Sequence, residues 1–557
     1  MWRLRIGSGP ARLAILVACT AVFLTALDQT VVVTALPQII LDLQIPIGQL
    51  DRAAWIISGY LLGYVIAMPL MGRVSDIFGR QRVFLICLGV FAFGSLFCGL
   101  APLLGSAVDI SFLKDVGIDV SSQGLIWLVA ARFIQAAGGG AVVPVAMAVA
   151  GDFYGWQERA LILGLIGMVT EAGGVLGPLY GSLIVQSLGW QYIFYLNLPI
   201  VALLLIAVVR FIPAASASTE EGSTRERIDL LGSFLLGASL VCLSLGLSQE
   251  AAQITPAKPA VGATPIQNDL RLLLAALILL ACFIALELYY ERRSQWPVID
   301  LSLFKRVMFS ATSLVSLLVG AALIIAMADI PIFIATVLNR SAIDSGLALL
   351  RLTALIPVGA IVGGWLCARI SCRWTAVIGL IATALGFWLM HLWPLNVGWT
   401  QITVSTIIAG SGFGLVIAPI STTALNAARE RQIGMASSVV TVLRMIGMIL
   451  GLAALTSWGL GRFRLLAAGF KAPAGVPAFS AHYNDLYSQF LVAAAHDVYS
   501  AIFLAAGVLC LVALVPAILL EGRKPSPYFI RSRDSDVDTL SSETESEAGA
   551  AHGQREK

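Results

Sequence analysis

Long apolar stretches, set apart by charged or Pro- and Gly-rich segments, constrain this chain more than any other feature of its sequence. A helix needs about 20 mainly apolar residues to cross the hydrocarbon core of a bilayer. We expect each stretch to be a helix, because a helix satisfies its own backbone hydrogen bonds in lipid. No alternation typical of a membrane β-barrel is present. The predicted fold class is an all-α polytopic membrane protein with fourteen spans: 13–36, 53–72, 83–104, 123–151, 160–187, 190–212, 229–249, 269–290, 308–338, 345–369, 374–394, 399–428, 433–460 and 498–521.

The composition excludes most other classes of protein. Charged residues make up 12% of the 557 positions and hydrophobic residues 58%, whereas about 25% of an ordinary soluble protein is charged. A soluble enzyme, a coiled coil and a disordered scaffold are therefore excluded. A net charge of +3 argues against nucleic-acid binding. Seven of the eight cysteines lie in apolar stretches and Cys372 lies in a short basic loop, so we expect no disulfide framework, no metal site and no cofactor.

The basic residues predict the orientation. Segments on the N-terminal side of the predicted membrane hold 24 of the 35 Lys and Arg, and segments on the other side hold 8. The positive-inside rule therefore places both termini in the cytoplasm, in a multi-pass protein of the cytoplasmic membrane. The first apolar run, 13–40, is too long for a signal peptide and is predicted to be a membrane span.

Two pairs of segments indicate a chain built from two similar halves. Residues 72–80 follow the second span much as 364–373 follow the tenth, and the Gly-rich stretch with a proline at 138–144 is similar to 410–419. Such repeats are typical of transporters with a central site between their halves. The predicted organisation is an N-terminal six-helix half at 1–212, a linker with two inserted helices at 213–307, a C-terminal six-helix half at 308–521 with a long outer segment at 461–497, and a disordered cytoplasmic tail at 522–557. The outer segment is compatible either with extended helices or with a loop.

Ionisable residues within the spans are the first candidates for function. Placing one at a helix centre costs about 2.5–3.5 kcal/mol on insertion scales. At about 1.5 Å per residue, Glu171 and Arg444 lie near the midplane and Asp28 lies in the outer half. We expect them to converge on one cavity, with Asp28 as the main proton carrier, Glu171 as a second carrier or cation-recognising group, and Arg444 as their electrostatic partner. The alternative is a static buried ion pair that fixes helix packing.

Asp329 and Arg351 lie in the outer thirds of consecutive spans. They are predicted to pair, either as an outer gate or as a simple brace between helices.

A short glycine-containing segment, 72–82, is predicted to form a tight cytoplasmic turn. Its glycines permit close chain reversal, and Asp76 suits a helix cap or an ion pair. A plain positive-inside loop explains these features as well. The segment nevertheless resembles the signature loop of the major facilitator superfamily, which implies that Asp76 joins a charge relay that locks one conformation. Ile77 and Gln81 stand where basic residues are usual. The residues that carry this resemblance are Gly72, Asp76, Gly79 and Arg80.

Further motifs narrow the resemblance to the fourteen-helix drug:proton antiporter group of that superfamily. Residues 27–37 resemble its first-span signature, although Val33 stands where Asn is common, and 132–138 resemble its helix-four motif. The latter similarity implies a proton-relay role for Arg132. Within the group, 59–64 and the long outer segment 461–497 are most similar to a mycobacterial branch that exports triacylglycerol. The resemblance covers residues 10–525.

A glycine- and proline-containing stretch in the fifth span resembles the antiporter motif of the same group, with Ser182 in place of a final glycine. Small residues on neighbouring helical faces permit close backbone approach, and a proline removes one backbone hydrogen bond. Packing alone accounts for such residues. The resemblance implies in addition that they seal the helix interface against proton leak. The motif residues are Gly173, Gly177, Pro178 and Gly181.

These observations predict a proton-coupled antiporter that exports amphiphilic or hydrophobic molecules, either drugs or lipids. Its expected partners are those molecules, protons and the bilayer, and an outer-side lipid acceptor is left open by the 461–497 segment. One alternative is a lipid exporter for which drug efflux is secondary. Another is a membrane-embedded transferase, which would need a cluster of His, Asp or Glu at a membrane surface, and the chain has only four His. An enzyme is not expected.

Overall fold

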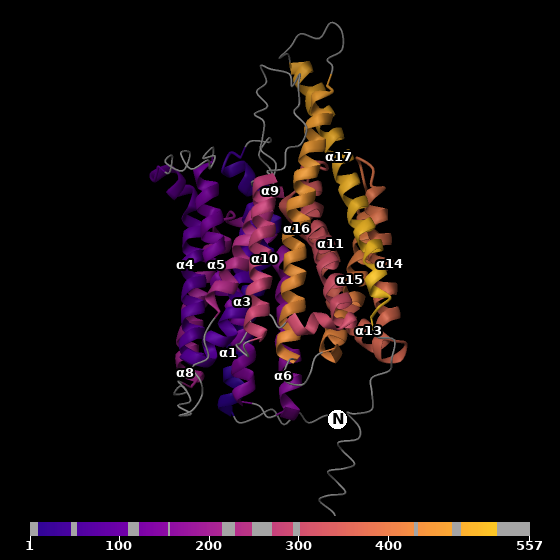
Figure 1. Ribbon diagram of the computed structural model, residues 1–557. Helices are drawn as coiled ribbons and strands as arrows, with labels where there is room; N and C mark the ends of the chain where they lie inside the picture. The colour runs from indigo at the N-terminus through magenta and orange to yellow at the C-terminus, as the bar shows by residue number, and fades with distance from the viewer. Residues whose placement is uncertain are drawn as a thin grey trace, which may run out of the picture.

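The computed structural model describes residues 9–45, 53–109, 122–153, 156–213, 229–247, 270–292, 301–427, 433–470 and 481–520. These residues form a bundle of helices and contain no strand (Figure 1). The helices are α1 (Gly9–Asp42), α3 (Trp55–Phe78), α4 (Arg80–Ala107), α5 (Gln123–Phe153), α6 (Trp156–Ser187), α7 (Tyr192–Tyr195), α8 (Asn197–Phe211), α9 (Leu230–Leu247), α10 (Leu270–Arg292), the 3-10 turn η3 (Leu301–Lys305), α11 (Val307–Thr336), α12 (Ala342–Thr353), α13 (Leu355–Arg369), α14 (Cys372–His391), α15 (Trp399–Ala427), α16 (Ile433–Ala468), α17 (Ala481–Val512) and α18 (Leu514–Ala517). We call the two ends of the bundle inner and outer, following the orientation that the basic residues predict.

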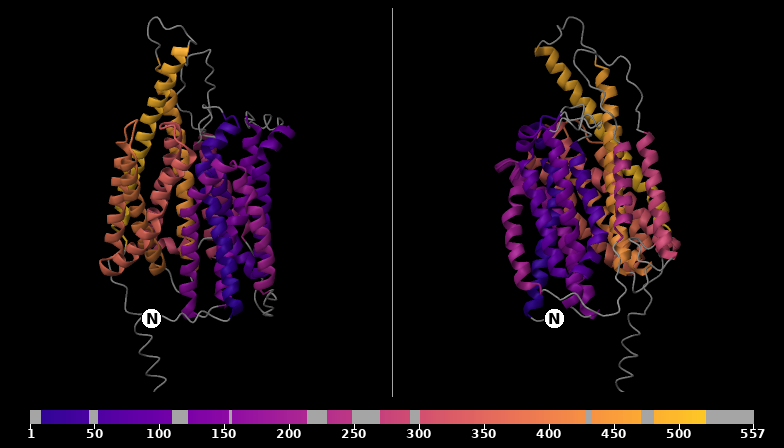
Figure 2. Two further views of the ribbon diagram at one scale, coloured as in Figure 1. Left: turned by 180° about the vertical axis from the view of Figure 1, so that it is seen from behind. Right: turned by 60° about the vertical axis from the view of Figure 1, so that its left-hand side comes forward.

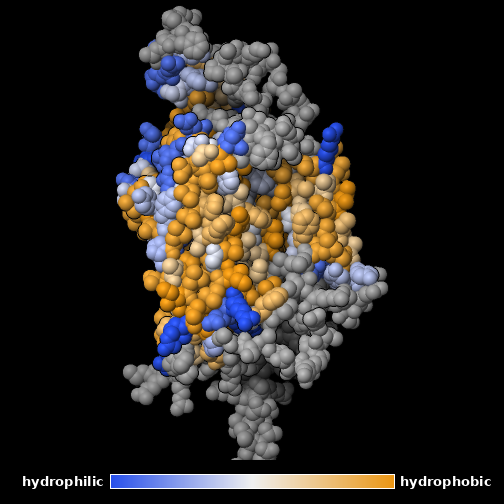
Figure 3. Space-filling view, turned by 90° about the vertical axis from the view of Figure 1, so that its left-hand side faces the viewer, coloured by the Kyte–Doolittle hydropathy of each residue, from blue (hydrophilic) through white to orange (hydrophobic). Residues whose placement is uncertain are grey.

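Twelve segments within the described residues are long and apolar enough to cross a membrane. The spans predicted at 53–72 and 229–249 correspond to shorter apolar stretches, Trp55–Met68 and Leu231–Leu247. The chain is therefore a multi-pass membrane protein with about twelve apolar helices, and the count of fourteen stays a prediction. Apolar side chains cover the middle of the face seen in Figure 3, and hydrophilic ones gather toward its two ends.

Two predicted spans differ from the helices of the structure in their bounds. The span at 345–369 is divided between Thr353 and Leu355 into α12 and α13. The last span was placed at 498–521, but its helix already begins at Ala481. As a result α16 and α17 continue beyond the other helices at the outer end (Figures 1 and 2). The described parts of segment 461–497 are therefore mainly helical. Residues 471–480 and the predicted tail at 522–557 lie outside the described residues.

The helices pack in two groups with the same internal arrangement. In the N-terminal part α5 packs against both α3 and α4, and α1 packs against α6. In the C-terminal part α15 packs against α13 and α14, and α11 packs against α16. The matching helix pairs occur in the same order in both groups, as do the two pairs of similar sequence segments. Between the groups, α9 contacts both α3 and α16, so the inserted pair α9 and α10 bridges them.

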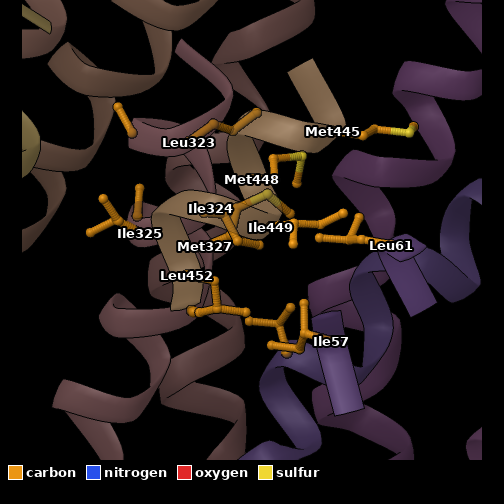
Figure 4. Packing of buried hydrophobic residues seen from close by; sticks show 14 of the residues in the cluster. Ile57, Leu61, Leu323, Ile324, Ile325, Met327, Met445, Met448, Ile449 and Leu452 are labelled. Carbon is orange, nitrogen blue, oxygen red and sulfur yellow. The ribbon is translucent and has the colours of Figure 1, made fainter. Parts of the chain in front are cut away.

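The described contacts between the two groups lie toward the outer end. Ile57 and Leu61, in the first two turns of α3, point toward α11 and α16 in the apolar cluster that includes Met448 and Leu452 (Figure 4). The hydroxyl of Thr353 in α12 donates to the backbone oxygen of Val175 in α6, at 3.3 Å. The outer half of the bundle is thus held together across the two groups by apolar packing and a backbone-directed hydrogen bond.

Two local expectations are corrected. Cys367 and Cys372 form a disulfide, because α13 ends and α14 begins between them and their Cα atoms lie 4.2 Å apart. The segment 72–82 is not a continuous turn. Helix α3 runs to Phe78, and α4 begins at Arg80. The chain reverses at Gly79 alone, whose φ of 92° is favourable only for glycine.

Candidate functional site

A buried carboxylate in α1 is the centre of the best-defined polar site. Asp28 is 1% exposed and accepts hydrogen bonds from three side chains on two other helices. Arg132 Nη1 donates to Oδ2 at 2.6 Å. Gln135 Nε2 and Asn197 Nδ2 donate to Oδ1 at 2.9 and 2.8 Å. A buried charge is tolerated only when it is paired and hydrogen-bonded, and Asp28 meets both conditions.

The partner of Asp28 is equally buried. Arg132 is 1% exposed, lies in α5, and donates from Nη1 to the side-chain oxygen of Gln135 at 2.7 Å as well. Its guanidinium carbon lies 4.0 Å from the centre of the Tyr60 ring and 5.6 Å from that of Phe194. Cation–π attraction adds to the ion pair when the guanidinium is desolvated in this way. Arg132 is therefore held by a carboxylate, an amide and two aromatic rings.

Three neutral side chains complete the network, and sequence reasoning did not single them out. Gln135 also donates to Ser95 Oγ at 2.7 Å, and Asn197 approaches the same oxygen at 3.4 Å. The network thus joins α1, α4, α5 and α8. Gln135 was within reach of prediction, because residues three apart share a helix face and Arg132 had been identified. Ser95 and Asn197 carry no such local signal, since only the tertiary fold brings them to Asp28.

The proline of the antiporter-like stretch explains a contact between α1 and α6. Pro178 has no N–H to donate to the oxygen of Gly174, four residues earlier in α6. The hydroxyl of Thr30 in α1 donates to that oxygen at 3.0 Å. One turn further along α1, Thr34 donates to the oxygen of Pro178 at 3.3 Å. The backbone oxygen that Pro178 leaves without an intrahelical donor is therefore satisfied by Thr30 of α1, two residues after Asp28.

The glycines of this stretch allow that close approach. A Cβ added at Gly173 would lie 2.7 Å from the backbone oxygen of Phe23 in α1. A Cβ at Gly177 would meet Thr30 and would lie 2.8 Å from the oxygen of Leu27, and one at Gly181 would lie 2.5 Å from the oxygen of Val31. No side chain larger than glycine fits these positions without moving a helix. The motif thus seats α6 directly on the turn of α1 that carries Asp28.

Arg444, another expected member of the proton-coupling group, is not among the side chains that meet Asp28. Arg444 is half-buried in α16, where its backbone oxygen contacts Gly320 of α11. The side-chain partners of Asp28 are Arg132, Gln135 and Asn197, so the expected pairing of Asp28 with Arg444 is replaced by pairing with Arg132. Glu171 lies in α6, one turn before Gly174. Its side chain lies outside the described residues, and its expected role remains a prediction.

The inner-end motif is described only in part. The side chain of Asp76 lies outside the described residues, and its expected charge relay stays a prediction, as does the contribution of Gly72. Arg80 Nη1 donates to Ser75 Oγ at 3.0 Å across the reversal at Gly79. Gln81, which departs from the usual basic residue, donates to the backbone oxygen of Ile212 at 2.8 Å. It therefore caps the end of α8, a role that a neutral amide performs well.

Asp329 and Arg351 do not form an ion pair, although both are described and half-buried. Arg351 instead stacks on the ring of Trp399 in α15, with its guanidinium carbon 4.7 Å from the ring centre. The expected pairing is therefore wrong. Trp399, the first residue of α15, takes the place beside Arg351 that was predicted for the carboxylate.

Comparison with known proteins identifies the family. The sequence model of the Major Facilitator Superfamily matches residues 18–452. The chain belongs to this superfamily. It is 34% identical over 535 residues to a triacylglyceride transporter of Mycobacterium tuberculosis strain H37Rv, with 92% of this chain and 95% of that protein covered. It is 35% identical over 521 residues to a triacylglyceride transporter of Mycolicibacterium hassiacum, covering 90% and 91%. The chain is therefore a transporter and not an enzyme.

Solved structures confirm the fold of this superfamily member. A bacterial homologue of the human lysosomal transporter Spinster superposes with a TM-score of 0.57, at 16% identity, covering 92% of this chain and 97% of that one. A D-xylose–proton symporter superposes with a TM-score of 0.55, at 12% identity, covering 90% and 97%. At such identities the likeness concerns the fold alone.

Proposed function

We propose that this transporter exports neutral lipids of the acylglycerol class and that inward proton movement through Asp28 drives the export. The buried Asp28–Arg132 pair supports the coupling, because it is a carboxylate that a proton can neutralise inside the membrane. The similarity to triacylglyceride transporters over nearly the whole chain supports the lipid substrate. Drug efflux is then a secondary activity.

A proton on Asp28 would change the network in a defined way. The neutral acid no longer attracts Arg132, and it offers a donor where Oδ1 or Oδ2 now accepts. Three donors meet the carboxylate in the described state, from Arg132, Gln135 and Asn197. Those contacts weaken on protonation, because a neutral acid is a poorer acceptor than a carboxylate and the ion pair with Arg132 is lost. The hold of α5 and α8 on α1 therefore weakens when the proton arrives.

The packing of α1 on α6 supplies a route from Asp28 to the other half. Thr30 and the motif glycines lock α1 to α6. Further along α6, Val175 accepts from Thr353, and Ser182 lies against Gly346 of α12. A shift of α1 after protonation would carry α6 with it and disturb this outer contact. We infer that the outer contact opens in this way and lets the substrate leave.

The finer topology belongs to the same proposal. We infer that Trp55–Met68 and Leu231–Leu247 also lie in spans, which gives fourteen helices with both termini in the cytoplasm. The six-helix halves are then the moving units, and the pair α9 and α10 connects them. At the outer end, Phe470 lies 5.1–5.6 Å from the rings of Tyr483, Tyr487 and Phe490. This aromatic cluster between α16 and α17 is where we expect an outer-side lipid acceptor to approach.

The test is lipid export from proteoliposomes under an imposed pH gradient. A fluorescent acylglycerol is followed into an acceptor outside the vesicles, with wild type and Asp28→Asn compared. Asparagine keeps the shape of the side chain but carries no proton. We expect gradient-driven export to fall to the level of empty vesicles, while downhill exchange without a gradient continues.

A matched control is Asp344→Asn, which removes a carboxylate that caps α12 and lies outside the network. It should leave gradient-driven export unchanged. Wild-type export that does not respond to the gradient would reject proton coupling. Export of a cationic dye in place of the acylglycerol would reject the lipid substrate and leave the coupling intact.

A further inference from the structure

Two arginines share one aromatic ring at the outer end of the C-terminal half. Arg340 lies in the connection between α11 and α12, and its guanidinium carbon is 4.6 Å from the centre of the Trp399 ring. Arg351, in α12, is 4.7 Å from the same centre. Both charges are therefore held within 5 Å of one ring. Two like charges on one ring repel each other, and an anion within reach of both would offset that repulsion.

The described part of the chain supplies no such anion. Neither Arg340 nor Arg351 forms an ion pair with a described carboxylate. Arg351 Nη1 is buried and has no hydrogen-bond partner. The nearest carboxylate in sequence, Asp344, accepts from Ser341 Oγ at 3.0 Å within the capping box of α12. A buried guanidinium donor without a partner is unfavourable, and an acceptor from outside the chain would relieve this.

The surroundings indicate that the missing acceptor comes with a lipid. Trp399 is the first residue of α15 at its outer end, the level where tryptophan is favoured at a membrane interface. Over the next turns α15 exposes Val404 at 48% and Ile407 at 38%. An acyl chain could lie along this apolar surface while its headgroup remained beside Trp399. A small soluble anion would make no use of that surface.

We propose that Arg340, Trp399 and Arg351 form a binding site for the phosphate of an anionic lipid headgroup in the outer leaflet. The two guanidinium groups donate to the phosphate oxygens, and Trp399 fixes the directions of both forks. Arg351 donates through Nη1, which has no hydrogen-bond partner in the structure. This site is separate from the Asp28 network, and the proposal does not rest on the proposed transport function.

The test measures lipid binding directly. The detergent-purified chain is titrated with phosphatidylglycerol and, separately, with phosphatidylcholine, and bound lipid is counted by native mass spectrometry. Arg340→Gln and Arg351→Gln are each expected to weaken phosphatidylglycerol binding about tenfold, because each removes a charged hydrogen bond. Phosphatidylcholine, whose headgroup carries a compensating cation, should bind more weakly to wild type and should not respond to either substitution.

The chain offers a matched control at its inner end. Arg369 also stacks on a tryptophan, with its guanidinium carbon 4.9 Å from the centre of the Trp365 ring. Arg369→Gln removes the same charge and the same type of stacking, and it should leave phosphatidylglycerol binding unchanged. An equal loss in this variant would show only a general attraction of basic residues for the lipid and would overturn the proposal.

Two further measurements test recognition by the guanidinium fork and distinguish a lipid phosphate from a free anion. Arg351→Lys keeps the charge but loses the planar fork, so binding should fall by less than in Arg351→Gln; equal losses would contradict recognition by the fork. Inorganic phosphate should displace phosphatidylglycerol only in large excess. Full displacement at equal concentrations would assign the site to a free anion and reject the lipid. Unchanged phosphatidylglycerol binding in both glutamine variants would reject the site altogether.

Discussion

Each half of the transporter stacks an arginine on an aromatic ring, but among the described residues only one of the two, Arg132, pairs with a carboxylate. In the N-terminal half Arg132 lies over Tyr60 and is paired with Asp28. In the C-terminal half Arg351 and Arg340 both lie over Trp399, and neither forms an ion pair with a described carboxylate. The first arrangement pairs the charge of its arginine within the chain, although the buried Nε of Arg132 has no hydrogen-bond partner there. The second leaves donors for something outside it. A stacked arginine alone therefore does not indicate function, and its counter-charge decides what it can do.

The helices that carry these groups are built alike. In the N-terminal half α1 and α6 meet through glycines, as where Gly181 faces the backbone of Val31. In the C-terminal half α11 and α16 meet in the same way: a Cβ added at Gly451 of α16 would lie 2.7 Å from the Cα of Ala321 in α11. The scaffold is repeated, while the polar chemistry is not. The difference between the halves thus lies in a few side chains placed on similar helix pairs.

Removing the counter-charged partner in the N-terminal half should have the largest effect. Arg132→Gln leaves the Asp28 carboxylate buried without a cation, which typically destabilises a protein by about 3–5 kcal/mol. We expect a clear fall in the thermal unfolding midpoint of the purified protein, measured by intrinsic fluorescence.

The double variant Asp28→Asn with Arg132→Gln serves as the control for that measurement. It removes both charges, so much of the lost stability should return, and the cycle of single and double variants gives the coupling energy. Additive losses in the cycle would show that the two residues do not act as a pair.

The contact that carries Asp28 against α6 should be next in sensitivity. Gly177→Ala places a Cβ against Thr30 and the backbone oxygen of Leu27, and overpacking of this kind costs about 1–3 kcal/mol. Gly167 lies in the same helix, with nothing within 4 Å of an added Cβ. Gly167→Ala should therefore be neutral or stabilising by about 0.5–1 kcal/mol. Equal melting points for the two variants would refute a tight packing role for the motif.

Sequence reasoning predicted the fold well because bilayer crossing depends on local composition. The apolar spans, the charge asymmetry and the repeated glycine segments are all visible in a linear chain. The breaks are less visible. The division at Ala354 lies just before Pro357, which has no N–H to donate to the oxygen of Thr353, but a proline in a membrane helix does not by itself end the helix. The early start of α17 at Ala481 lies in a mixed polar and aromatic sequence. Such boundaries are set by packing against other helices.

For the site, the sequence indicated which residues are important but not which residues they contact. Asp28 is predicted from its unfavourable place in a membrane and Arg132 from its resemblance to a family motif, yet the predicted partner of Asp28 is Arg444. Depth along a helix can be estimated from the rise per residue, but the direction of a side chain around the axis depends on the partner helices. A search for charged residues also misses neutral hydrogen-bond partners. Asn197 became visible only when α8 was placed next to α1.

The smallest stability effect is expected in the C-terminal half. Arg351→Gln removes one cation–π contact, worth about 0.5–1 kcal/mol near a surface, and also removes a buried donor that has no partner. Loss of stacking and relief of the unmet donor oppose each other. The unfolding midpoint in detergent without anionic lipid should therefore change little, in contrast to Arg132→Gln. Added phosphatidylglycerol should raise the midpoint of wild type and not that of the variant, because ligand binding stabilises only the state that retains the site. A large loss in lipid-free detergent would mean that Arg351 has an internal acceptor, and the contrast between the two halves would then disappear.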